Sequence, residues 1–202
     1  MKINPYEQIG IWHNNALDYI INNNQNPTLD EALNLISSYF FAFLGVPPPE
    51  SIKYSIKETC AWGVNNNSDE IEVRRNRVQV TNNQLPYADQ IYDNNTGLTV
   101  SQLNAYYLNI ENNILNSDLE MYEQRSFLIA TAVGKHSANY WTDVSNNPSH
   151  PWHSFTQLTD YVGYVFAGVT AAFDGSVLIS TGRMDVQEYI AAFASTSCFS
   201  SL

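Results

Sequence analysis

The chain has 202 residues, of which 9 are Lys or Arg and 20 are Asp or Glu, so its formal net charge is −11. A chain this acidic is repelled by a phosphate backbone at long range, which excludes nucleic acid as an expected partner. Hydrophobic residues make up 44% and aromatic residues 13% of the chain, which excludes general disorder. The composition therefore predicts a folded protein that is long enough to bury its own core.

The first part of the chain predicts two helices with recognisable start signals. Asn4 followed by Pro5 is typical of a helix N-cap with proline at the first helical position. Apolar residues then recur at three-to-four spacing as far as an asparagine-rich stretch. Thr28 and Glu31 have the spacing of a capping box. The helix that they begin is expected to end at Gly45, before three prolines.

The middle of the chain predicts shorter elements. Helices are expected at about 50–61 and 86–92, whereas residues 71–80 are predicted to be irregular. Thr99 or Ser101 is expected to begin a further helix.

The rest of the chain is also predicted to be helical. Ser117 and Glu120 form a second capping-box pattern at the start of the longest periodic segment, which runs to about Asp143. A very apolar helix is expected at about 155–173, and a final helix near Asp185. We therefore predict one all-α domain over residues 1–202, a bundle of six to eight helices.

One predicted helix near the C-terminus carries a ridge of small residues spaced four apart. The small-residue ridge consists of Gly163, Ala167, Ala171 and Gly175. Small side chains at this spacing let another helix approach closely. The uncharged stretch around the ridge is shorter than the roughly 20 residues that cross a bilayer, so the segment predicts the central buried helix of a bundle. The alternatives are pairing with a second copy and insertion of the 155–182 region into a membrane, which the scarcity of basic residues disfavours.

Two histidines suggest a metal site. His150 and His153 lie in a loop that is flanked by Asp143 and Asp160. Imidazoles with nearby carboxylates are common ligands of zinc and other divalent ions, but this spacing matches no diagnostic motif. We therefore expect no cofactor, with the loop packed by Pro151 and Trp152 and the histidines in solvent. The alternative is a divalent ion held by the two histidines and the two acids.

The other two histidines lie in predicted helices. His136 shares an apolar stripe, and His13 adjoins the apolar face of the first helix. A histidine in such a position is usually a hydrogen-bonded structural group. If the two met in space, they would form a pH-sensitive pair in a buried polar site.

The two cysteines and the start of the chain bear on its compartment. Cys60 and Cys198 are too few for a disulfide scaffold. They are either two unpaired packed thiols or one long-range disulfide bridge. The first five residues reach a helix-start signal without the apolar segment of a signal peptide. The sequence therefore predicts a cytoplasmic protein, or an exported one if a leader has been removed.

Two short patterns carry a resemblance. The segment from Asn4 to Leu17 reads N-P-x-x-x-x-G-x-x-H-N-x-x-L, and Ser137 precedes a Tyr140-Trp141 pair. Both patterns resemble segments in a group of uncharacterised all-helical proteins from Bacteroidetes-type bacteria, several of which look exported or lipid-anchored. The resemblance implies an all-helical fold and supplies no catalytic residue.

No motif in the sequence identifies a reaction. The chain lacks a G-x-S-x-G elbow and the glycine-rich phosphate-binding loops. Frequent tyrosine and asparagine are typical of wet recognition surfaces. Five tyrosines cluster in the middle of the chain: Tyr87, Tyr92, Tyr106, Tyr107 and Tyr122. We therefore expect a non-enzymatic protein that binds a protein or glycan partner or a second copy of itself; the alternatives are a metal-dependent hydrolase that uses the His150 loop and a membrane-active protein.

Overall fold

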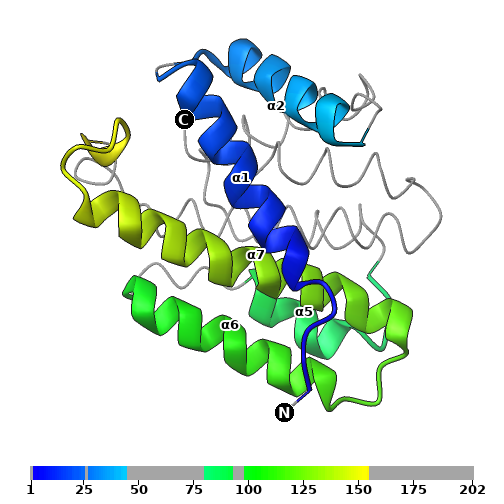
Figure 1. Cartoon of the computed structure of the whole chain (residues 1–202). Helices are drawn as coiled ribbons and strands as arrows, with labels where there is room; N and C mark the ends of the chain where they lie inside the picture. The colour runs from blue at the N-terminus through cyan, green and yellow to red at the C-terminus, as the bar shows by residue number, and fades with distance from the viewer. Residues whose placement is uncertain (1, 26, 45–79, 93–97, 155–202) are drawn as a thin grey trace.

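The computed structural model describes residues 2–25, 27–44, 80–92 and 98–154, and every regular element in these ranges is an α-helix (Figure 1). The helices are α1 (Glu7–Asn23), α2 (Leu29–Leu44), α5 (Leu85–Tyr92), α6 (Val100–Leu115) and α7 (Met121–Asn146). The all-α prediction is confirmed for this part of the chain. Several predicted features lie outside the described residues: the helix at 50–61, the irregular stretch at 71–79, the small-residue ridge, the 155–182 region, the final helix and both cysteines.

Helix α7 is the element against which α1 and α6 pack. It has 26 residues. Helix α6 precedes it in the chain, and after a short turn α7 runs back antiparallel to α6 (Figure 1). Helix α1 crosses α7 on a different face, and α2 packs on α1. The core between these helices contains large side chains that are almost fully buried, including Trp141, Tyr107 and Phe127.

The starts of α2 and α6 are fixed by local hydrogen bonds at residues that the sequence predicted to begin helices. The backbone N–H of Thr28 donates to Glu31 Oε2 at 2.8 Å, and Glu31 N donates to Thr28 Oγ1 at 3.4 Å. The Thr28 N–H bond, together with a bond that Thr28 Oγ1 donates to Glu31 Oε2 at 2.9 Å, holds the pKa of the Glu31 carboxyl below its usual value. Thr99 and Gln102 form the same reciprocal pair at the start of α6. The predicted capping box at Thr28 is confirmed, and of the two starts predicted for α6, Thr99 and Ser101, Thr99 is the N-cap. Such starts can be predicted because their contacts lie within one turn of sequence.

The predicted start of α1 is wrong by two residues. The helix begins at Glu7, and its N-cap is Tyr6. Asn4 lies earlier, where its Oδ1 accepts a hydrogen bond from Tyr6 N at 2.9 Å and closes a turn before the helix. Asn4 is buried, and its side-chain amide is left to donate to other elements.

The predicted capping box at Ser117 is wrong by three residues. Ser117 belongs to the end of α6, because its Oγ donates to Ile114 O at 2.7 Å. Helix α7 begins after Glu120, whose backbone N–H donates to the carboxylate of Glu123 at 3.2 Å. The buried Glu123 side chain also accepts from Thr81 Oγ1 at 2.7 Å. A contact across 42 residues therefore helps to set this helix start.

Two glycines let neighbouring helices approach α7 closely. A Cβ at Gly134 would lie 2.5 Å from the ring of Tyr107 in α6. A Cβ at Gly10 would lie 2.4 Å from the ring of His136 and 2.5 Å from Ala132 O. Neither position has room for a methyl group, so α6 and α1 both pack against α7 at a glycine.

We expect Gly134→Ala to lower the free energy of unfolding by about 1–3 kcal/mol, because the added methyl group overpacks the Tyr107 contact. Helix propensity alone acts in the opposite direction, since alanine is favoured over glycine in a helix by about 1 kcal/mol. Urea unfolding followed by circular dichroism measures the difference. In a Tyr107→Leu background the same change is expected to cost less. A Gly134→Ala protein as stable as the unmodified one would contradict the packing.

Candidate functional site

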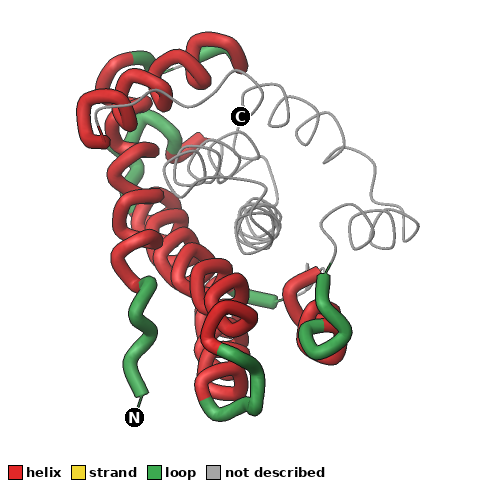
Figure 2. The backbone as a smooth tube through the Cα atoms, turned by 90° about the vertical axis from the view of Figure 1, so that its right-hand side faces the viewer, coloured by secondary structure: helices red, strands yellow, loops and turns green. Residues whose placement is uncertain are grey.

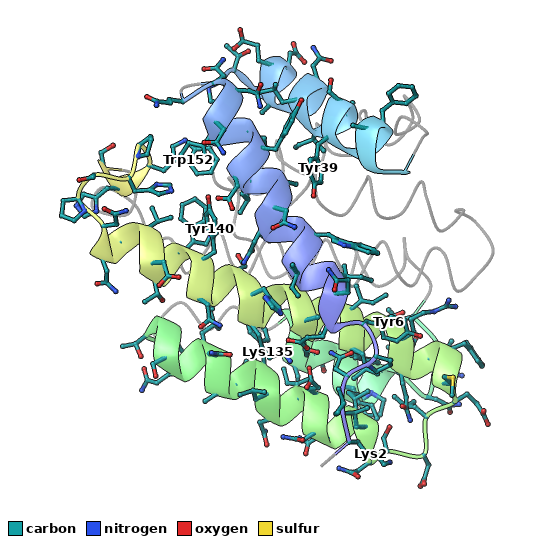
Figure 3. The ribbon with its side chains drawn as sticks, in the orientation of Figure 1. Lys2, Tyr6, Tyr39, Lys135, Tyr140 and Trp152 are labelled. Carbon is teal, nitrogen blue, oxygen red and sulfur yellow. The ribbon has the colours of Figure 1, made fainter. Side chains whose placement is uncertain are left out.

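Polar side chains from the chain start, α1, α6 and α7 meet in one cluster, in the region of Lys135 in Figure 3. We call this cluster the polar junction. It consists of Asn4, Glu7, His13, Asn14, Glu111, Thr131, Lys135 and His136. Its members are up to 132 residues apart in sequence, from position 4 to position 136, so the fold alone brings them together.

Lys135 lies at the centre of the polar junction. Its Nζ is 2.7 Å from Glu111 Oε2 and 2.8 Å from Glu7 Oε2. The side chains of Lys135 and Glu111 are each 10% exposed, whereas Glu7 is 40% exposed. The ammonium therefore joins a buried carboxylate to one that reaches solvent. A buried charge needs such pairing, because its loss of hydration is otherwise uncompensated.

Hydrogen bonds from the chain start and α7 complete the environment of Glu111. Asn4 Nδ2 donates to Glu111 Oε2 at 2.8 Å and to Leu128 O at 2.7 Å. Thr131 Oγ1 lies 3.4 Å from the same carboxylate oxygen. Just before Asn4, the ammonium of Lys2 donates to Leu115 O. These contacts anchor the first residues of the chain to both α6 and α7.

Asn14 links the two helical histidines. Its Nδ2 donates to His136 O at 3.0 Å, and its Oδ1 lies 2.9 Å from His13 Nδ1. His136 Nε2 lies 2.9 Å from Glu7 Oε1. The structure thus brings His13 and His136 into one site, as considered from the sequence, but joins them through Asn14.

The two histidines differ in burial. His13 is 1% exposed, whereas His136 is partly exposed beside Glu7. The pKa of His13 is lowered from 6.5 to about 4, chiefly by burial; the Asn14 hydrogen bond opposes this change, and the nearby His136 adds to it. His13 is therefore a neutral ring at physiological pH.

The four polar or glycine positions of the N-terminal pattern all serve this site. Asn4 bonds α6 and α7, Gly10 lets α1 approach α7, and His13 and Asn14 belong to the polar junction. Leu17 is fully buried in the core. The spacing of these residues in the N-terminal pattern therefore reflects their places in the polar junction and the core.

The partners of the N-terminal pattern carry no comparable signal. Sequence reasoning missed Glu7, Glu111, Thr131 and Lys135. Each is a common residue type; Glu7 falls at an unspecified position of the pattern, and the other three have no motif around them.

The predicted metal loop uses its histidines for internal contacts. His150 Nδ1 accepts a hydrogen bond from Trp152 N at 3.2 Å, and His153 Nδ1 lies 3.2 Å from Val144 O. Among the residues that the structure describes, no three His, Cys, Asp or Glu side chains gather as metal ligands would. Asp160 lies outside the described residues, so a metal site that includes it stays a prediction.

Asp18 of α1 is the carboxylate that acts on His150. Burial lowers the pKa of His150, and the charge of Asp18 opposes this change. Asp143, which the sequence offered as a possible metal ligand beside the loop, is exposed on α7. The loop and α1 are far apart in sequence, so no spacing rule points to Asp18.

Trp152 packs the loop as expected, whereas Pro151, which was also expected to pack it, is exposed. Trp152 is almost fully buried and stacks on Trp141, with ring centroids 5.9 Å apart and an interplanar angle of 20°. Its Nε1 donates to Gln25 O at 3.1 Å, beyond the end of α1 (Figure 3). The loop after α7 is therefore tied to the C-terminal end of α1.

Comparison of the chain with protein-family models, with curated proteins and with solved structures found no match. The resemblance to the Bacteroidetes-type helical proteins stays a prediction. Among the helices described here, none is long and apolar enough to span a membrane.

We expect Lys135→Met to lower the free energy of unfolding by about 3 kcal/mol, because Glu111 is then a buried carboxylate without its counter-ion. The matched control is Lys135→Met with Glu111→Gln, which removes both charges and leaves an amide that can still accept from Asn4. This double variant should lose clearly less stability. Urea unfolding at neutral pH measures all three proteins, and equal losses in the single and double variants would contradict the assignment.

We expect the protein to lose stability in mildly acidic solution through His13. Its pKa is lower in the folded state, about 4, than the ordinary value of 6.5, so the folded state binds fewer protons. The contribution is fully present above pH 6.5 and is lost as the pH falls toward 4. Linkage gives a loss of about 2 kcal/mol between about pH 7 and about pH 5.

The control for this pH dependence is His13→Gln, which cannot titrate in this range. Urea unfolding at both pH values should give a smaller difference in unfolding free energy for His13→Gln than for the unmodified chain. The same acid-induced loss in both proteins would show that His13 is not its source.

Proposed function

We propose that the chain is a helical interaction protein that associates with a second copy of itself through the end of the molecule at which α7 begins. The observation that carries the proposal is the exposure of large apolar side chains at this end. Ile3 is 85% exposed, Met121 is 79% exposed and Tyr122 is 50% exposed. We call these three residues the apolar end surface. Grouped apolar side chains in water are typical of protein–protein contacts.

Anchoring contacts hold the apolar end surface in place. Ile3 lies between Lys2 and Asn4, which bond Leu115 O and Leu128 O respectively. The chain start is therefore fastened across the end of α6 and the first turns of α7. In Figures 1 and 2 the chain start and the turn between α6 and α7 lie at the same end of the molecule. A surface that is ordered before binding loses little conformational entropy on binding.

Charges beside the apolar end surface favour a second copy as the partner. Arg125, one turn into α7, is half-buried. Asp118 is exposed in the turn just before α7. In a two-fold symmetric contact the same surface occurs on both sides, so Arg125 of each copy can face Asp118 of the other. This local pairing offsets the repulsion between two copies of net charge −11.

The predicted tyrosine cluster favours a protein contact over a glycan-binding surface. Tyr107 is buried, Tyr87 and Tyr106 are half-buried, and Tyr122 belongs to the apolar end surface. Glycan-binding platforms present aromatic rings to solvent. The rings of Tyr87, Tyr106 and Tyr107 instead pack against the core of the protein.

For the chain as a whole we propose a single-domain bundle of six to eight helices with the apolar helix at about 155–173 at its centre. The start of the small-residue ridge lies in this helix. The support is the three-to-four periodicity of the remaining sequence and the helical character of the described part.

The association is tested by light scattering over a range of protein concentrations. We expect the mean molecular mass to rise toward that of a dimer, and Ile3→Asp with Met121→Asp to keep the protein monomeric. Leu108→Asp is the matched control, because Leu108 is also exposed, at 42%, but lies in the middle of α6. A monomer at every concentration, or equal dissociation by the control, would refute the proposal.

A charge exchange tests the symmetric arrangement itself. Arg125→Asp should weaken dimer formation about tenfold, and Arg125→Asp combined with Asp118→Arg should restore it, because the opposite charges face each other again. If the double variant does not regain association, the pairing of Arg125 with Asp118 is refuted. The apolar contact is tested separately by the light-scattering experiment.

A further inference from the structure

His13 carries a feature that self-association does not use. The hydrogen bonds of Asn14 fix which way its side-chain amide points, because the amide nitrogen donates to His136 O at 3.0 Å. The oxygen of the amide therefore faces His13 Nδ1, at 2.9 Å. An amide oxygen only accepts hydrogen bonds, so Nδ1 of the neutral ring carries the proton.

The other ring nitrogen is consequently a bare acceptor. With the proton on Nδ1, Nε2 of His13 presents a lone pair. The side chain is 1% exposed, and no donor in the part of the chain that the structure describes bonds this nitrogen. A buried acceptor left without a partner costs about 1–3 kcal/mol. Buried polar atoms of this kind are usually satisfied by a bound molecule when the chain supplies no donor.

The chemistry of the site narrows what it can bind. Burial lowers the pKa of His13 to about 4, so the ring does not become a cation that would attract an anion at neutral pH. A positively charged donor would lose its hydration on entering the buried site. The described residues offer no set of three metal ligands. A neutral O–H donor fits these conditions, because it needs only the one acceptor that His13 provides.

We propose that His13 Nε2 is the acceptor of a buried site for a neutral hydroxyl group, supplied either by a trapped water molecule or by a small organic ligand. Asn14 positions the ring, in the way that a hydrogen bond to one imidazole nitrogen orients the other toward its ligand. The site lies on the face of α1 that packs against α7, next to the Gly10 contact. It is independent of the apolar end surface.

The test is ¹⁵N NMR of the histidine rings in the unmodified protein at neutral pH. The protonated nitrogen and a bare or hydrogen-bonded nitrogen resonate at different positions, so both the tautomer and the state of Nε2 are measured. The His13 signals are assigned from His13→Gln. If that variant does not fold, they are assigned by elimination from His136→Gln, His150→Gln and His153→Gln.

Two arms distinguish the sources of the hydroxyl. Without additive, a protonated Nδ1 and an Nε2 resonance moved from the bare position support a trapped water molecule. If Nε2 is bare, phenol is added, and toluene serves as the control of similar shape without a hydroxyl. A saturable shift with phenol and none with toluene supports an organic hydroxyl ligand.

Three results would overturn the proposal. They are a proton on Nε2, a bare Nε2 that neither compound moves, and a bare Nε2 that both compounds move equally. Each is independent of the oligomeric state, so the outcome does not depend on the self-association experiment.

Discussion

The position of the chain start and of α1 depends on one ammonium group. Lys135 faces Glu111 from α6 and Glu7 from α1, and all three belong to different helices. Because Lys135 and Glu111 are largely buried, each needs the other to compensate for lost hydration. Few relative placements of the three helices bring these charges together. The ion pairs therefore contribute more to fixing how the helices are placed than to the free energy of unfolding. The hydrogen bonds from Asn4 and Thr131 restrict those placements further.

Close helix contact and polar pairing support each other in this fold. Gly10 brings the backbone of α1 against α7, and at that separation the short side chain of Asn14 reaches a backbone carbonyl of α7. A larger residue at position 10 would move the helices apart and lengthen the bonds at Glu7 and Asn14. The apolar packing and the polar junction therefore form a single structural unit, and a change in one is expected to appear in the other.

Features that depend on neighbouring residues could be predicted from the sequence. The cap at Thr28 involves a partner three residues away, so its spacing alone identified it, and Thr99 was one of the two starts predicted for α6. The helical character of α1, α2, α6 and α7 followed from apolar periodicity for the same reason. A prediction was wrong where a side chain expected to bond its own helix forms hydrogen bonds with residues far away in the sequence. Asn4 was predicted to cap α1, but its amide is held by α6 and α7.

The candidate site could be predicted only in part. The N-terminal pattern contains one side of it, yet nothing near Glu111 or Lys135 in the sequence indicates that they pair across 24 residues. Asp18 was missed for the same reason, since its effect on His150 depends on how the loop after α7 returns to α1. A charged site whose residues come from separate helices is hard to predict from the sequence, because those residues form no motif within any one segment.

The bonds of the polar junction have a consequence for how the protein folds during synthesis. Asn4 bonds a carbonyl 124 residues later, and Glu7 bonds Lys135 and His136 after 128 and 129 residues. Contacts of such long sequence separation require a large loop to close before they contribute, which slows their formation. During synthesis, α1 has no charged partner until α7 has been made. Its apolar face therefore stays uncovered by α7 until 128 further residues have been added after Glu7, and apolar surface that is exposed in this way favours aggregation.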